Sequence, residues 1–86
     1  MNPAQELIQQ KPYLIWYTKS YDQLEDASIV EAVLNYGDWG DVQEIIKILG
    51  IKRVAEIFHQ YAFRPRTNYF PQICNYFSLY FEKYAR

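Results

Sequence analysis

The two side chains with the richest chemistry each occur once, because His59 is the only histidine and Cys74 the only cysteine. A zinc site needs several such ligands, and a nucleophile needs a base and an orienting group beside it. His59 falls at the edge of the polar face of its expected helix, and Cys74 at the border of an aromatic stripe. We therefore predict a surface histidine and a cysteine that acts as a small apolar residue. We expect no catalytic residue, no metal and no cofactor.

Six carboxylates fall into two groups: Asp22, Glu25 and Asp26, and then Asp38, Asp41 and Glu44. The second group lies in the first turns of an expected helix, where carboxylates cap free amides and favour the positive end of the dipole. The first group precedes or opens another helix and lacks the spacing of a calcium loop. No glycine-rich phosphate loop is present either. Both groups are interpreted as signals for the start of a helix.

Charge is segregated along the chain. Every charged side chain from Asp22 to Glu44 is acidic, and only Glu56 interrupts the five basic residues that follow: Lys47, Lys52, Arg53, Arg64 and Arg66. A basic strip could contact nucleic-acid phosphates, and two helices around Gly50 invite comparison with a helix-turn-helix. Two positions that this motif needs apolar are Glu56 and His59, and the formal net charge is -1. Nucleic-acid binding is therefore the alternative function. Against it, Arg64 and Arg66 are expected to be solvated in their loop or to pair with the acidic stretch.

The last expected helix carries an aromatic stripe. At about 100° per residue, one arc of roughly 140° holds eight side chains: Tyr69, Phe70, Ile73, Tyr76, Phe77, Tyr80, Phe81 and Tyr84. The phenylalanines and the isoleucine are predicted to pack in the core. The four tyrosines lie on the other side, where Tyr supplies stiff contact area with a polar tip. We predict that they contact a protein partner or a second copy, with Arg64 and Arg66 meeting an acidic partner surface.

Prolines and glycines divide the chain into helices. Asn2 and Asp38 are expected to cap helices, whereas Gly37 and Gly50 are expected to end them. The expected helices cover 3–10, 23–36, 39–49, 52–62 and 69–84, with a buried extended or turn-like segment at 13–17. The fold class is then all-α, a single compact domain with a short N-terminal helix and apolar segment (1–20), a three-helix middle (21–63) and an aromatic C-terminal helix (67–86).

Composition limits the class of protein. The 86 residues are 50% hydrophobic and 19% aromatic, with nine Tyr, five Phe and two Trp. A chain of this size can bury one core, and its modest net charge argues against disorder. No apolar run approaches the roughly 20 residues of a membrane span, and the N-terminus lacks the pattern of a signal peptide. The single cysteine excludes an internal disulfide, so the cytoplasm is the expected location.

One stretch resembles a known family. Ile29–Trp39 (IVEAVLNYGDW), followed by Leu49-Gly50 and the basic loop 64–68, resembles small bacterial proteins encoded beside nucleotidyltransferase-like toxins of the AbiEii class. Leu14-Ile15-Trp16 matches an apolar segment of that family, whereas Phe70-Pro71 stands where the family often has Phe-Trp. The resemblance covers roughly residues 14–77. It implies a non-enzymatic, antitoxin-like protein that binds and restrains a larger partner with the nucleotidyltransferase fold.

Overall fold

The computed structural model of the chain describes residues 2–16 and 20–85. Within these ranges every regular element is helical, which confirms the all-α class and the single compact domain. Two short 3-10 helices, η1 (Pro12–Leu14) and η2 (Tyr21–Gln23), accompany five α-helices. The latter are α1 (Pro3–Gln10), α2 (Asp26–Tyr36), α3 (Trp39–Leu49), α4 (Ile51–Ala62) and α5 (Pro71–Tyr84).

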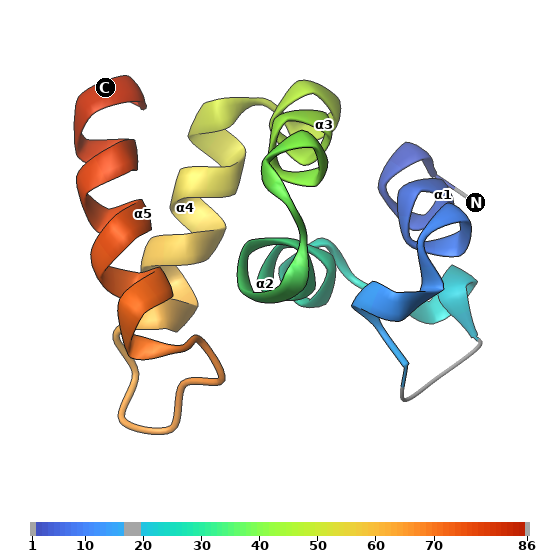
Figure 1. The fold of residues 1–86 in the computed structure, drawn as a ribbon, viewed down its shortest axis with the longest axis horizontal. Coiled ribbons are helices and arrows are strands. Elements are labelled where there is room, and N and C mark those ends of the chain that lie inside the picture. The colour runs from blue at the N-terminus through green and yellow to red at the C-terminus, as the bar shows by residue number, and fades with distance from the viewer. Residues whose placement is uncertain (1, 17–19, 86) are drawn as a thin grey trace.

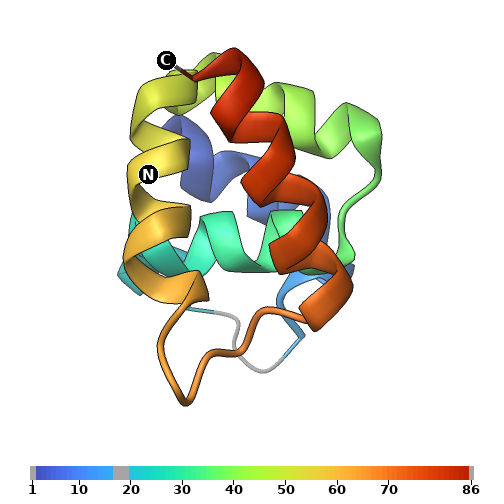
Figure 2. The same cartoon turned by 90° about the vertical axis from the view of Figure 1, so that its left-hand side faces the viewer.

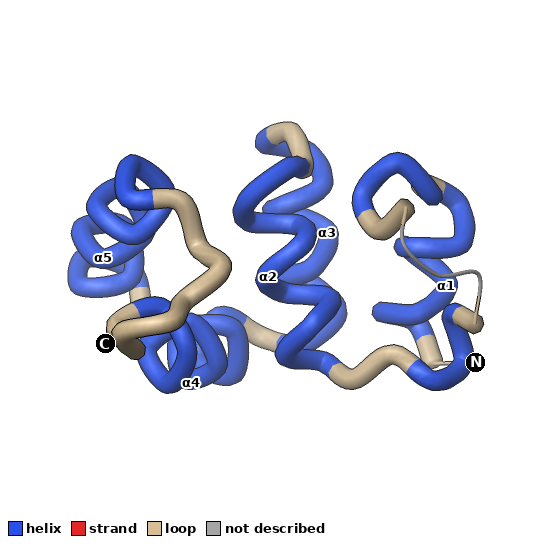
Figure 3. The backbone as a smooth tube through the Cα atoms, turned by 90° about the horizontal axis from the view of Figure 1, so that it is seen from below, coloured by secondary structure: helices blue, strands red, loops and turns tan. Residues whose placement is uncertain are grey.

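The helices form three layers (Figure 1). α4 and α5 run antiparallel as a hairpin that forms one outer layer, and a view onto this hairpin places α1 behind it (Figure 2). α2 and α3 lie between these layers, which is clearest from below (Figure 3). α2 packs against α1, α3 and α4. The hydrophobic core is therefore built around this middle layer.

Helix starts follow the expected caps in two cases. The Asn2 Oδ1 atom accepts a hydrogen bond from the Gln5 amide at 2.8 Å, and Asp38 Oδ1 accepts one from the Asp41 amide at 2.9 Å. In each case the third helical residue returns a side-chain bond to the cap, which completes a capping box. The predicted starts of α1 and α3 are therefore confirmed.

Two predicted helix starts are too early. Tyr21–Gln23 forms the separate turn η2, so α2 begins at Asp26 rather than residue 23. α5 begins at Pro71 rather than Tyr69, because proline is favoured in the first turn and biases the residue before it toward extended backbone. Phe70 has that geometry, with ψ 145°.

Several aromatic side chains predicted to be buried lie at the surface. In the 13–17 segment Leu14 and Ile15 are buried, but Tyr13 and Trp16 are 56% and 65% exposed; residue 17 lies outside the described ranges. Tyr36 and Phe70 are also exposed, although the helical pattern placed both on buried faces. Tyr36 lies in α2, where helical spacing gives a direction around the axis but not the distance to the next layer. Tyr13, Trp16 and Phe70 lie outside the α-helices, so α-helical spacing does not set their directions. Phe77 and Phe81 are buried as predicted.

A buried carboxylate joins α3 to the end of α1. Asp41 has no exposed surface, and it accepts hydrogen bonds from Lys11 Nζ, from Tyr13 Oη at 3.0 Å and from the Asp38 amide at 3.0 Å. Gly37 leaves room for it, since a β-carbon there would lie 2.9 Å from Asp41 Cβ. Burial by itself would raise the pKa of the Asp41 carboxyl, but these bonds outweigh it, so the pKa lies below its usual value.

We expect this lowered pKa to make the domain sensitive to acid. Because the folded-state pKa lies below the unfolded-state value of 3.8, the stabilisation by Asp41 is full above about pH 4 and is lost as the pH falls through the folded-state pKa. Urea unfolding between pH 2 and 7 measures this loss. Asp41→Asn, which removes the titrating group, should show a shallower decrease in acid. An equal decrease in both proteins would contradict the assignment.

Candidate protein-binding surface

Four aromatic rings from two helices form one continuous patch, called here the Trp–Tyr face: Trp39, Tyr76, Tyr80 and Tyr84. The Trp39 ring meets Tyr80 edge to face with centroids 5.4 Å apart, and Tyr76 at 6.5 Å. Tyr80 also stacks with Tyr76 at 6.3 Å and contacts Tyr84 at 4.8 Å. The face is therefore a packed array in which each ring limits the motion of the next.

The Trp–Tyr face is open to solvent. Trp39, Tyr76 and Tyr84 expose 49%, 51% and 54% of their surface, and Tyr80 is half-buried among them. Edge-to-face ring pairs of this kind are favourable beyond the area that they bury. The face thus presents a large apolar area whose side chains are already held in place, so binding a partner would cost little further side-chain entropy. This is a property of protein-binding surfaces.

The helices explain how this face forms. Tyr76, Tyr80 and Tyr84 repeat every four residues on α5, so they lie in a row. Phe77 and Phe81 lie next to that row and are buried, and their rings contact Phe58 of α4. The hairpin therefore turns the tyrosines of α5 outward while its phenylalanines fill the core.

Trp39 belongs to this face but was not among the predicted site residues. It is the first residue of α3, directly after the Asp38 cap. At about 100° per residue it falls at the edge of the apolar arc of its helix, about 20° from Ile46. That position was a usable signal, because a Trp at the edge of an apolar arc is placed to contact a neighbouring helix and solvent together.

Tyr69, predicted as an interface residue, is in the core. It is only 3% exposed and its ring meets Phe58 at 5.3 Å. The prediction is wrong because Tyr69 precedes α5, so its direction does not follow the helical spacing of the other tyrosines. Its hydroxyl is buried without a hydrogen-bond partner among the described residues. Burial, followed by the nearby charge of Glu31, raises the pKa of this phenol.

We expect Tyr69→Phe to stabilise the protein. The change removes a hydroxyl that costs desolvation energy and keeps the ring contact with Phe58, so the free energy of unfolding should rise by about 1 kcal/mol. Urea unfolding, monitored by circular dichroism, measures the change in the free energy of unfolding. Tyr84→Phe, at an exposed position, is the matched control and should change stability by less than about 0.5 kcal/mol. A loss of stability in Tyr69→Phe would mean that the hydroxyl is bonded in the folded protein.

The predicted charged contacts lie in the loop between α4 and α5. Arg64 and Arg66 are exposed, and the Arg64 guanidinium lies 4.4 Å from the centre of the Tyr61 ring. This contact orients Arg64 without removing its charge. Because the loop precedes α5, the arginines and Tyr84 lie at opposite ends of that helix, about 20 Å apart at 1.5 Å per residue. One partner would have to span α5 to touch both.

Two of the three other basic residues lie close to carboxylates. Arg53 Nη2 lies 4.0 Å from Asp26 Oδ2, and Lys52 lines a cavity together with Glu56 and Glu82. Lys47 is exposed in the last turn of α3. Because carboxylates lie beside Lys52 and Arg53, these two residues do not form an uninterrupted basic strip. Nucleic-acid binding through these residues stays a prediction.

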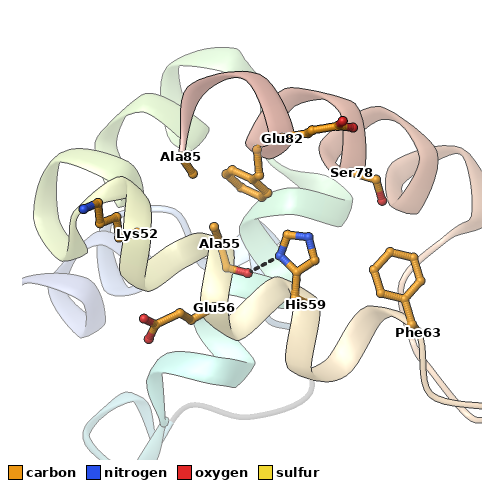
Figure 4. A pocket seen from close by; sticks show the side chains of 9 residues that line it. Lys52, Ala55, Glu56, His59, Phe63, Ser78, Glu82 and Ala85 are labelled. Atoms are coloured by element: carbon orange, nitrogen blue, oxygen red, sulfur yellow. Dashed lines mark hydrogen bonds between the residues drawn. The ribbon is translucent and has the colours of Figure 1, made fainter.

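A cavity of about 740 Å³ lies between α4 and α5 (Figure 4). His59 is exposed at its edge, as predicted, and its Nδ1 atom donates to the Ala55 carbonyl at 2.8 Å. In the tautomer that makes this bond, Nε2 is the acceptor nitrogen of the ring. Ser78 Oγ donates to the Cys74 carbonyl of its own helix. The serine proton is thus directed to the backbone rather than to the imidazole.

Cys74 is half-buried, and its thiol donates to the Ala62 carbonyl at 3.5 Å, so it joins α5 to the end of α4. In residues 2–16 and 20–85, no three His, Cys, Asp or Glu side chains are arranged to hold a metal ion. Among the helices of these same ranges, none has both the length and the apolar character that a membrane crossing requires.

The chain matches no protein-family model, no curated protein and no solved structure. The family resemblance carried by Ile29–Trp39 therefore stays a prediction.

Proposed function

We propose that this chain is a non-enzymatic protein-binding domain that docks a different protein on its Trp–Tyr face. The observation that carries the proposal is the packing of Trp39 against Tyr76 and Tyr80, which leaves three of the four rings about half exposed. Exposed apolar patches are rare on monomers unless they serve binding. Tyr and Trp are also the side chains that most often anchor protein interfaces.

The proposed partner is a nucleotidyltransferase-fold protein, and the proposed role is that of an antitoxin which restrains it. The sequence resemblance supports this class of partner. Arg64 and Arg66 are proposed to meet acidic side chains of the partner, beyond the end of the aromatic contact. Such charged contacts act on association rate and orientation more than on total affinity.

Co-expression with the product of the neighbouring open reading frame tests this proposal. We expect the two proteins to elute together in size-exclusion chromatography as one stable complex. Separate elution at micromolar concentration would contradict the antitoxin role. Sedimentation equilibrium of the chain alone tests whether the Trp–Tyr face instead binds a second copy. A dimer that is lost in Tyr76→Ala would assign the face to that second copy and not to a different protein.

A further inference from the structure

A second aromatic cluster, separate from the Trp–Tyr face, lines a pocket together with the half-buried side chain of Glu31. Tyr36 meets Trp16 with ring centroids 5.1 Å apart and planes at 79°, and meets Phe70 at 5.4 Å and 88°. These rings line a pocket of about 400 Å³ together with Glu31, and it is called here the Glu31 pocket. Its remaining walls are Leu14, Ala32 and Asn68.

The Glu31 pocket is held together by specific hydrogen bonds. The Asn35 amide donates to the Asn68 carbonyl at 3.0 Å, and its oxygen accepts from the Phe70 amide at 3.2 Å. Asn35 thus fixes the end of the α4–α5 loop against α2, where the loop bends toward that helix (Figure 3). The Asn68 side chain also bonds Glu31. Phe70 therefore keeps its position beside Tyr36.

Glu31 lacks a charge partner within the described ranges, where the ion pairs are Lys11–Asp41 and Arg53–Asp26. Burial raises the pKa of its carboxyl, and the bond from Asn68 opposes this only in part. An ionised carboxylate in such a place attracts a cation, and the faces of aromatic rings attract cations as well. The pocket therefore has two independent features that favour the same kind of ligand.

We propose that the Glu31 pocket binds a small quaternary ammonium compound of the choline type. Methyl groups on nitrogen can contact the rings of Trp16, Tyr36 and Phe70 and the apolar walls. A primary ammonium is strongly hydrated and must lose bound water to enter the pocket. Among the residues that the structure describes, the only charged group that it would gain there is one carboxylate, already bonded to Asn68, so it should bind more weakly. This site is separate from the Trp–Tyr face, so it does not depend on the proposed function.

NMR titration of the full chain with choline chloride tests this binding. The protein has two tryptophans, and their indole N–H signals are assigned with Trp16→Phe and Trp39→Phe. We expect choline to shift the Trp16 signal saturably, with a dissociation constant in the millimolar range or below, and to leave Trp39 unmoved. The neutral isostere 3,3-dimethylbutan-1-ol and the primary amine ethanolamine should each bind at least about tenfold more weakly.

Glu31→Gln keeps the bond to Asn68 and removes the charge, and we expect it to weaken choline binding about tenfold. Glu56→Gln, on α4, is the matched control and should leave binding unchanged. Thermal unfolding verifies that both variants fold. Equal binding of choline and its neutral isostere would overturn the proposal in favour of a plain apolar groove, and so would full affinity in Glu31→Gln. Tighter binding of ethanolamine than of choline would assign the pocket to a primary ammonium and also overturn it.

Discussion

Replacing Phe58 by alanine should lower the free energy of unfolding by about 4 kcal/mol. Phe58 has no exposed surface, and its ring lies 5.4 Å from Phe81 and 5.3 Å from Tyr69. It therefore joins α4 to α5 and to the loop between them. A domain of this size has about 4–13 kcal/mol of stability in total. The loss would remove between about a third and all of that stability.

Phe63 provides the matched control for this change. It contacts the same Phe58 ring at 5.9 Å but is 61% exposed. Phe63→Ala should therefore cost less than about 1 kcal/mol, because little area returns to water. Urea unfolding of both variants measures the difference. Phe58→Ala could instead lower the free energy of unfolding by less than about 1.5 kcal/mol, close to the loss in Phe63→Ala. The aromatic junction of α4 and α5 would then not be the main source of stability in the hairpin.

Trp39→Ala should weaken binding of the partner at least about 30-fold, which corresponds to about 2 kcal/mol. The indole lies between Tyr76 and Tyr80, so its removal takes away its own contact area and also the ring that orients both tyrosines. Since Trp39 is about half exposed, the variant should stay folded. Isothermal titration with the co-purified partner measures the affinity, and thermal unfolding verifies the fold.

Trp16→Ala is the control for that measurement. Trp16 is 65% exposed and contacts Tyr36 instead of the Trp–Tyr face. It should change partner affinity less than about threefold, since residues outside the anchor region of an interface contribute little. Equal losses in the two variants would mean that the partner covers both aromatic clusters.

Local sequence signals predicted the helices well. The pairs Asn2 with Gln5 and Asp38 with Asp41 act within one turn, so their spacing is sufficient to place α1 and α3. Pro71 is also a local signal: its backbone chemistry starts α5 at residue 71, later than the aromatic pattern alone indicated. The lesson is that a cap or a proline decides a helix start more reliably than the first apolar residue.

Placement of the aromatic residues could be predicted only in part. Spacing along α5 separates Tyr76, Tyr80 and Tyr84 from the core phenylalanines, because these residues share one helix. It cannot place Tyr69, which lies before the helix, or bring Trp39 of α3 beside Tyr80. Those positions depend on how the layers pack, and contacts of that kind join segments about 40 residues apart without any local signal.

Binding through the Trp–Tyr face is the central claim, and NMR of the two indole N–H signals tests it most directly. The chain is titrated with its co-purified partner, and both signals are followed at saturation. We predict a large change or broadening of the Trp39 signal, while the Trp16 signal keeps its position apart from the broadening caused by the larger complex. A complex that moves the Trp16 signal and leaves Trp39 unmoved would contradict the claim.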